Sequence, residues 1–350
     1  MYDNTRNTGD YITDIKLDKY SNVFITGTSY YKADSSENFI IKCDKDLNYL
    51  WGQTYLAPVV VDREYNHLAV DDSGNVFVTG KLTIKFSPDG NVQWTRFGAD
   101  FIVVDEWRQA ISAIRQNSQW IIEKYDENGN DLWAIAYDDG VSMGFITKMI
   151  IDDLDNIYLS GSKGWPNESW HTVKINAGGG IDWKADVSSS VGKAYVYDLA
   201  IDRKINVYVT GTVVDVSGDN FMSAVTVKYD PKGKEVWRQV DGTGNNRDEY
   251  GACISVNDSL TVVVGGLKSD TENRYSGDLL VWQYKQHERF KAIPDGWNFQ
   301  NAENPMWQPD HWIQFDYSKP PYPPGWVGWY LAMPFDWPDW PVFVRAFGES

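Results

Sequence analysis

An all-β fold built from repeated four-stranded units is predicted by two phrases that alternate along the chain. The first phrase has Lys, one bulky residue and a turn-forming residue, with Trp seven positions after the turn-former. The second phrase has Asp, then Asn four positions later, then Gly five positions after the Asn. Repetition at a period of about 40–50 residues is typical of propellers and solenoids. The first phrase occurs five times, at residues 42–51, 85–94, 124–133, 174–183 and 228–237.

The second phrase precedes the first in each unit and completes the strand pattern. It lies at residues 18–27, 71–80, 152–161 and 202–211, and degraded copies keep the spacing at 105–114 and 257–266. Each unit therefore contains an apolar strand, an Asp/Asn turn, a strand such as Val-Phe-Val-Thr-Gly, a variable loop, the Lys strand, a turn that usually contains Gly, and the Trp strand. Short β-branched and aromatic runs between Gly, Asn and Asp indicate strands joined as hairpins. Asp accepts hydrogen bonds from its own turn, and Asn or Gly adopts positive φ at low cost.

Six units of four antiparallel strands predict a β-propeller of six blades, an arrangement that leaves few sheet edges exposed. Seven blades are the alternative, if residues 311–347 form one more. The third unit departs most from the pattern because Gln109 and Ile114 replace the Asn and the Gly, which leaves its middle hairpin in question. The large rings of the repeated Trp residues are expected to fill the wedge between blades. These structural residues are Trp51, Trp94, Trp133, Trp183 and Trp237.

The two phrases resemble the SBBP β-propeller repeat of bacteria and archaea. Residues 71–80 (DDSGNVFVTG) and 124–133 (KYDENGNDLW) are near matches to its two motifs, and the resemblance covers about residues 10–285. It implies a propeller that is exported or on a cell surface, and it implies no common reaction. A weaker likeness to quinoprotein propellers is disfavoured, because that class needs vicinal cysteines and Cys43 and Cys253 are far apart in the sequence.

The composition indicates a large folded core and excludes some partners. The chain has 350 residues, 42% of them hydrophobic, and a formal net charge of −17. Such an acidic surface repels nucleic-acid phosphates and anionic lipids. The sequence has no apolar run of about 20 residues, so no membrane insertion is expected. The first residues lack the features of a signal peptide, which indicates either that the protein is not exported by that route or that the chain is already trimmed.

Two domains are predicted: a propeller over residues 1–286 and an irregular Trp/Pro-rich C-terminal strap over 287–350. By the spacing of the repeat, the first residue of the chain follows directly after the position of an outer strand that is missing. The sixth unit also has no outer strand of its own in the repeat pattern. Residues 296–299 are the first candidate to supply that strand, and 341–344 the second. The strap holds ten of the 14 prolines, which disfavour long helices and central strands. It is expected to seal its own propeller, to dock on a protein partner or another subunit, or to bind sugars, through Trp307, Trp312, Trp326, Trp329, Trp337 and Trp340.

No catalytic, metal or cofactor motif is recognisable in the sequence. The four histidines are scattered without metal-ligand spacing. No nucleophile-elbow, zinc-protease or nucleotide-binding motif occurs. The Asp-rich turns at 71–75 and 152–156 lack the later Glu of a calcium loop and are explained by hairpin chemistry. Cys43 and Cys253 are interpreted as buried core thiols, with a disulfide between the first and sixth units as the alternative.

Loop length indicates the binding face. In the predicted propeller, the long irregular loops join second to third strands and fourth strands to the next blade, so they share one face. Propeller ligands are expected among such loops. The candidate contact residues are Trp165, Trp170, Tyr30, Tyr31, Arg247 and Tyr275, with packing inside their own loops as the alternative role.

The sequence thus predicts a non-enzymatic structural or interaction module, a subunit of an extracellular, cell-surface or virion-like assembly. Its expected partner is a protein or a second copy engaged through the tail. A lectin-like module that binds glycans through the long-loop face is the first alternative. A polysaccharide hydrolase or lyase is the second, although no paired carboxylates stand out.

Overall fold

The computed structural model describes residues 10–32, 35–57, 66–164, 168–188, 193–214, 221–241, 248–257, 261–269, 277–285, 313–314 and 329–330. These residues form 25 strands and no helix. Five four-stranded sheets, one three-stranded sheet and a two-stranded pair follow one another in chain order. All strand pairs within the sheets are antiparallel neighbours in sequence, as expected for a propeller of up-and-down blades.

The first three sheets contain strands β1 to β12. Blade 1 consists of β1 (Asp10–Leu17), β2 (Val23–Lys32), β3 (Ser35–Cys43) and β4 (Tyr49–Ala57). Blade 2 consists of β5 (Leu68–Val70), β6 (Val76–Val78), β7 (Leu82–Phe86) and β8 (Val92–Phe97). Blade 3 consists of β9 (Phe101–Val104), β10 (Ala110–Gln116), β11 (Gln119–Tyr125) and β12 (Asp131–Tyr137).

The remaining sheets contain strands β13 to β25. Blade 4 consists of β13 (Met143–Ile151), β14 (Ile157–Lys163), β15 (Ser169–Ile175) and β16 (Ile181–Val187). Blade 5 consists of β17 (Ala194–Ile201), β18 (Val207–Val214), β19 (Met222–Tyr229) and β20 (Glu235–Asp241). Blade 6 consists of β21 (Glu249–Val256), β22 (Thr261–Ser269) and β23 (Gly277–Lys285). The short strands β24 (Ile313–Gln314) and β25 (Trp329–Tyr330) pair with each other.

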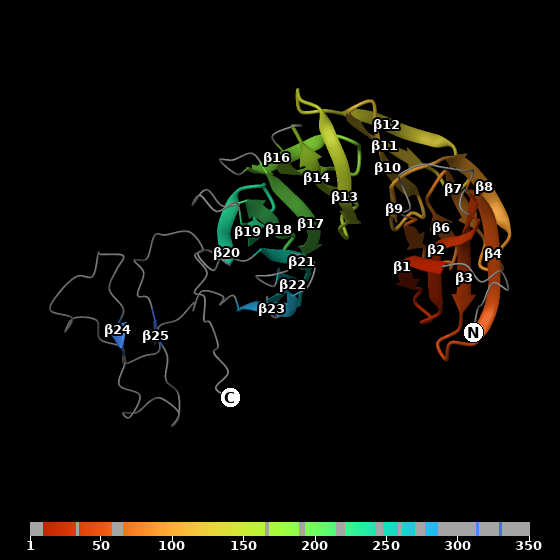
Figure 1. The fold of residues 1–350 in the computed structure, drawn as a ribbon. Helices are drawn as coiled ribbons and strands as arrows, with labels where there is room; N and C mark the ends of the chain where they lie inside the picture. The colour runs from red at the N-terminus through yellow and green to blue at the C-terminus, as the bar shows by residue number, and fades with distance from the viewer. Residues whose placement is uncertain are drawn as a thin grey trace, which may run out of the picture.

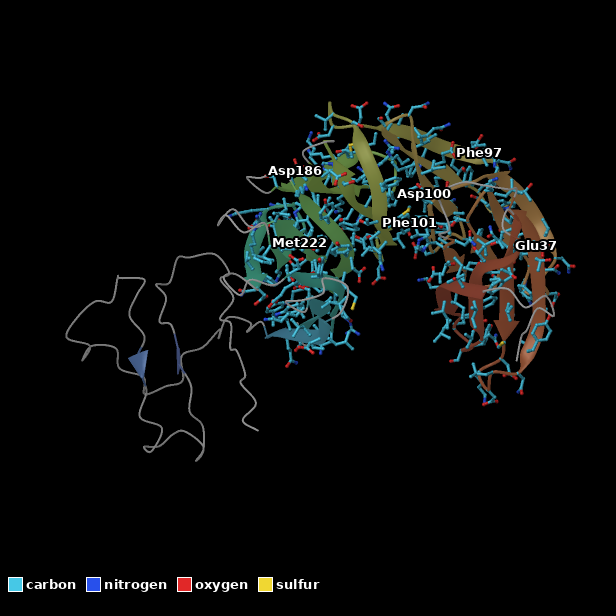
Figure 2. All side chains as sticks on the ribbon, viewed as in Figure 1. Glu37, Phe97, Asp100, Phe101, Asp186 and Met222 are labelled. Atoms are coloured by element: carbon cyan, nitrogen blue, oxygen red, sulfur yellow. The ribbon has the colours of Figure 1, made fainter. Side chains whose placement is uncertain are left out.

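The six blades follow an open arc, with blade 1 at one end and blade 6 at the other (Figure 1). In blades 1, 3, 4 and 5 the first strand lies on the inside of the arc and the fourth strand on the outside (Figure 1). Figure 2 shows the same arrangement for two side chains, with Phe97 from the outer strand β8 toward the rim and Phe101 from β9 toward the inside. The all-β propeller prediction is confirmed. Blade 6 has three strands among the described residues. The segments proposed as its outer strand, 296–299 and 341–344, lie outside those residues.

The third unit forms its hairpins despite the lost Asn and Gly. Asp105 Oδ1 accepts hydrogen bonds from the backbone N–H groups of Trp107 and Gln109 at 2.9 and 2.7 Å. Strands β10 and β11 are joined by Asn117 and Ser118 alone, which have φ of 52° and 63°. Two consecutive residues with positive φ are typical of a two-residue hairpin turn, which suits the twist of paired strands.

The Asp/Asn turns close on themselves. Asp71 Oδ1 accepts hydrogen bonds from the N–H groups of Ser73 and Asn75 at 2.9 and 2.8 Å, and the Asn75 amide donates to Asp71 Oδ2 at 2.7 Å. The turn at Asp152 has the same bonds. These carboxylates are therefore used by the hairpins, as the turn interpretation predicted.

Neighbouring blades are joined by a repeated contact between a Trp and a Gly turn. Trp51 in β4 donates its indole N–H to the carbonyl of Pro88 in blade 2 at 2.8 Å. Gly90, in the same turn, has φ of 83°, and a Cβ added to it would lie 2.8 Å from Trp51 Cδ2. Only glycine lets the turn lie flat on the indole. We call this the Trp–Gly contact. It recurs as Trp94 with Glu127 O and Gly129, Trp133 with Ala177 O and Gly179, and Trp183 with Pro231 O and Gly233.

Aromatic rings flank the indole on both sides at most junctions. Phe24 of the same blade and Phe86 of the next blade each have ring centroids 6.3 Å from Trp51. Lys42, the register partner of Trp51, places its ammonium 5.1 Å from the Phe24 ring and donates to the Pro88 carbonyl. The repeated Trp residues thus pack between blades. The equivalent aromatic sets are Phe77, Trp94 and Tyr125; Tyr158, Trp183 and Tyr229; and Tyr208, Trp237 and Tyr284.

Both cysteines are free thiols, so the disulfide alternative is not formed. Cys43 is partly exposed and Cys253 is exposed, which corrects the prediction that both are buried core thiols. The reason is their position at the ends of the arc. Strand alternation puts Cys43 on the side of blade 1 opposite to Phe24, which packs on blade 2. It puts Cys253 on the side of blade 6 opposite to Ile254, which packs on blade 5.

Substitution of one turn glycine tests the Trp–Gly contact. We expect Gly233→Ala to lower the free energy of unfolding by several kcal/mol, because the new Cβ would lie 2.5 Å from Trp183 Cγ. Gly140→Ala is the matched control, since Gly140 also has positive φ, 73°, but no atom lies within 4 Å of the added Cβ. The control is expected to lose only about 1–2 kcal/mol from backbone strain. Urea unfolding measures both, and equal losses would contradict the contact.

Candidate functional site

Five polar and charged side chains gather at the loop end of blades 3 and 4. Tyr137 ends β12, Asp139 lies in the connection to β13, and Lys163 ends β14. His171 comes from β15 and Asp186 from β16. We call these five residues the blade 3–4 cluster. Asp186 is labelled beside β16 in Figure 2. Up-and-down strand order brings the ends of β12, β14 and β16 and the starts of β13 and β15 to this one face of the arc.

His171 is fully buried and both of its ring nitrogens are bonded. Nε2 lies 2.6 Å from the Tyr137 hydroxyl, and Nδ1 lies 2.6 Å from Asp186 Oδ1. The Tyr137 ring stacks on the imidazole with a centroid distance of 5.7 Å and an interplanar angle of 17°. The Trp120 ring closes another side at 5.7 Å. The imidazole is therefore held in one orientation, with no nitrogen available to a substrate.

Lys163 bridges the two carboxylates of the cluster. Its ammonium donates to Asp186 Oδ2 at 2.6 Å and also to Asp139 Oδ2. Lys184 donates to the other oxygen of Asp139. Because the Lys163 and Asp139 side chains are only 11% and 10% exposed, this pair is shielded from solvent more than a surface ion pair.

The pKa shifts follow from burial and these bonds. Burial would raise the pKa of Asp139, but the hydrogen bonds from Lys163 and Lys184 outweigh it and lower the pKa to about 2. Burial also opposes the lowered pKa of Asp186, which the bonds to His171 and Lys163 produce. Burial lowers the pKa of Lys163, yet its bonds to Asp139 and Asp186 raise it overall. Burial, with the nearby Asp139 carboxylate, raises the pKa of Tyr137. At neutral pH both carboxylates and the ammonium are charged.

The cluster has the donor atoms for a metal, but a lysine already takes that place. One ligand atom each from Asp139, His171 and Asp186 lies within 4.8 Å of the others. The Lys163 ammonium lies between the two carboxylates. Tyr137 is hydrogen-bonded to His171, and Lys184 forms an ion pair with Asp139. The arrangement fits an internal ion-pair network that joins blades 3 and 4.

A small cavity of about 130 Å³ lies beside the cluster and shares Lys163 with it. Arg115 at the end of β10 donates its Nε–H to the Met143 carbonyl at 2.8 Å. The Arg115 guanidinium lies 5.5 Å from the centre of the Phe145 ring, and Phe145 is 61% exposed. Glu168 completes the charged lining. The cavity thus offers one exposed aromatic ring with both signs of charge around it.

The residues predicted to contact a ligand are placed as follows. Trp170 is 2% exposed and lies in the core between blades 4 and 5, where a Cβ on Gly211 would lie 2.6 Å from its ring. This corrects its assignment as a loop-face contact: the side chain points into the sheet interface. Tyr30 and Tyr31 lie in β2, and their side chains are outside the described residues. Trp165, Arg247, Tyr275 and the tail residues Trp307, Trp312, Trp326, Trp337 and Trp340 are also outside them, while Trp329 is described only as part of β25.

The sequence did not reveal the blade 3–4 cluster, although one signal was present. His171 pairs with Gly161, a register position that Phe39 and Val225 hold in blades 1 and 5. A histidine in place of an apolar residue at a repeated strand position indicates a local polar contact. Its partners come from other strands, so spacing along the chain could not predict them.

The comparisons with known proteins bear on the fold. No protein-family model matches the chain, and no curated protein matches it. Among solved structures, the β-propeller domain of the Trilobed protease from Pyrococcus furiosus is 11% identical, with a TM-score of 0.46 over 78% of this chain and 82% of that one. PorZ, a surface component of the type-IX secretion system of Porphyromonas gingivalis, is 11% identical, with a TM-score of 0.45 over 77% of this chain. The chain spans 41% of PorZ and 55% of a matched eukaryotic initiation factor, which has 10% identity and a TM-score of 0.41 over 65% of this chain. In the described part of the chain, no helix has the length and hydrophobicity needed to span a bilayer.

The ion-pair network predicts a specific acid sensitivity. Because the pKa of Asp139 is lower in the folded chain than its ordinary 3.8, its stabilising effect is complete above about pH 4 and is lost as the pH falls toward about 2. We expect Asp139→Asn to be less stable than the wild type at pH 7 and to lose less stability between pH 4 and 2. Urea midpoints across this range measure both effects.

Asp153→Asn is the control for that measurement, because Asp153 is an exposed carboxylate in a hairpin turn of blade 4. The control variant should keep the full acid slope. If Asp139→Asn also kept it, the network would not stabilise the folded chain.

Proposed function

We propose that this chain is a non-enzymatic interaction module that binds a protein surface through the loop end of blades 3 and 4. The observation that carries the proposal is the exposed Phe145 ring beneath the Arg115 guanidinium, beside a small charged cavity. Aromatic residues and arginine are enriched at the centres of protein interfaces, where they supply much of the binding energy. The neighbouring cluster gives that surface a rigid support, because its side chains are bonded to one another.

The titratable groups of the blade 3–4 cluster are already hydrogen-bonded to one another, which supports a non-enzymatic role. General acid–base catalysis needs a titratable group within hydrogen-bond reach of a substrate. His171 is fully buried and bonded at both nitrogens, and Asp139 and Asp186 are both bonded to Lys163. Among the described residues, no other set of three His, Cys, Asp or Glu side chains brings its ligand atoms this close together.

A second copy of the chain is the proposed partner, through a local charge contact that must outweigh the overall repulsion between two acidic molecules. The molecule carries a net charge of −17, and Arg115 presents a positive group on the loop face. An acidic region of another copy complements such a group. We further propose that this association serves a cell-surface, extracellular or virion-like assembly of an SBBP-type propeller, a placement supported by the repeat resemblance alone.

A lectin-like role is the second candidate, and the same cavity favours it. Sugar rings stack on exposed aromatic faces while charged side chains bind their hydroxyl groups. Phe145, Arg115 and Glu168 provide both kinds of group around about 130 Å³.

Light scattering over about 1–100 µM tests the proposal. We expect the mass per particle to rise with concentration, and Phe145→Ala to weaken the association about fivefold or more, because a buried interface aromatic contributes more than about 1 kcal/mol. Phe97→Ala is the matched control, since Phe97 is 74% exposed but lies on the outer strand of blade 2.

The other outcomes separate the alternatives. A chain that stays monomeric throughout contradicts self-association. Saturable glycan binding that Phe145→Ala abolishes and Phe97→Ala leaves intact would support the lectin. Turnover of a polysaccharide that Asp186→Asn abolishes would overturn both binding roles.

A further inference from the structure

The two ends of the arc present sheet faces that pack on no neighbouring blade in the described part of the chain. The blade 1 end face is the side of blade 1 turned away from blade 2; its residues are Ile12, Ile15, Leu17, Cys43 and Tyr49. The blade 6 end face is the side of blade 6 turned away from blade 5; its residues are Cys253, Val263, Leu267, Leu279 and Val281. Figure 1 shows the two blades at opposite ends of the arc.

Both end faces expose large apolar side chains. On the blade 1 end face, Ile12, Leu17 and Tyr49 are 67%, 64% and 60% exposed. On the blade 6 end face, Leu279 and Val281 are 84% and 73% exposed. At the other junctions the equivalent faces are buried against a neighbouring blade. Leaving such faces in water costs about 25 cal/mol per Å² of apolar surface.

The blade 1 end face lacks the residues on which the Trp of a neighbouring blade packs at the other junctions. Leu47 occupies the position of Gly90 and Gly233, with φ of 64° and 70% of its side chain exposed. Cys43 occupies the position where Phe86 and Tyr229 meet the indole of the preceding blade. A Trp–Gly contact cannot form there, because the leucine side chain takes the space of the indole.

The blade 6 end face lacks the residues that accompany the Trp on the donating side of a Trp–Gly contact. Val263 and Gln283 replace the aromatic and lysine pair formed by Tyr208 and Lys228 in blade 5. Cys253 replaces Asp198, whose carboxylate accepts the N–H of Ile254 in the next blade at 3.0 Å. Direct packing of blade 6 on blade 1, in one chain or between two copies, would therefore have none of the repeated contacts.

We propose that residues 286–350 of the same chain cover both end faces and close the arc. The chain leaves β23 at Lys285, on the edge of blade 6 that has no fourth strand among the described residues. The segment that follows holds seven Trp residues, which match an apolar surface that lacks its own indole. Strands β24 and β25 pair within it, so this segment has hydrogen-bonded strands to contribute. This assignment is independent of the loop-face function proposed above.

The two free thiols report directly on the end faces. Single-cysteine chains are made as full-length Cys43→Ser and Cys253→Ser variants, and a reference thiol is placed at Asp153→Cys in a chain lacking both. Labelling with a polyethylene-glycol maleimide is followed with and without urea. We expect both native thiols to react at least about tenfold more slowly than the exposed reference in the folded chain, at every protein concentration. In urea all three should react alike.

A short bis-maleimide on the wild-type chain completes the test. The proposal expects no Cys43–Cys253 cross-link, because the tail separates the two faces. Native thiols as reactive as the reference would show bare end faces and overturn it. Protection that appears only at high concentration, with a cross-link between chains, would assign the faces to a second copy instead. Protection with a cross-link inside one chain would mean direct closure by blades 1 and 6, and would also overturn it.

A variant on the face itself provides a second measure. Leu279→Glu should raise the labelling rate of Cys253 toward that of the reference, because a carboxylate disfavours the apolar cover. Phe97→Glu, on the exposed outer strand of blade 2, should leave that rate unchanged. Equal effects of the two variants would contradict a cover held by the end face.

Discussion

The packing of one indole on one glycine turn determines how this chain arranges its blades. Each contact needs a Trp in the fourth strand, a carbonyl in the next blade to accept its N–H, and a residue without Cβ beside it. The fourth residue of the turn has positive φ, and the register shifts by one residue directly after the Lys, as between Lys85 and Phe86. Leu47 has the same positive φ, so it is the indole packed on the turn that requires a residue without Cβ. Local turn chemistry and long-range packing therefore use the same residue.

The position of the Trp–Gly contacts explains which parts of the repeat vary in sequence. The turn end of the blades carries the Trp–Gly contacts, so its sequence repeats. The loop end carries no such contact, and blades 3 and 4 add the ion-pair network of Asp139, Lys163 and Asp186 there. The end blades are exceptions for a different reason. Leu47 and Val263 stand where the repeat has Gly and an aromatic ring, at the two ends of the arc. The junction of blades 3 and 4 also departs from the repeat, since Ile111 and Ile175 replace aromatic rings there, but it keeps the Trp133 contact with the Gly179 turn.

The sequence predicts the scaffold well because its signals are local. The Asp-to-Asn spacing at 71–75 and the Lys-to-Trp spacing at 85–94 each describe one hairpin, and both hairpins form with the expected bonds. Trp170 was misplaced because its position beside a long loop suggested exposure, whereas strand alternation turns it into the core. The partners of His171 come from β12 and β16 and meet it only through packing between strands. Because its members come from different strands, such a site has no regular spacing in the sequence that could predict it.

The most direct test of the Trp–Gly contact is a double-mutant cycle between Trp183 and Gly233. Trp183→Ala, Gly233→Ala and the double variant are compared with the wild type by urea unfolding, each fitted for its free energy of unfolding. If the contact joins blades 4 and 5, removing the indole should relieve the alanine clash, so the cost of Gly233→Ala should fall by more than about 1 kcal/mol in the Trp183→Ala background. Additive losses, within about 0.5 kcal/mol, would show that the two residues act independently and would contradict the account.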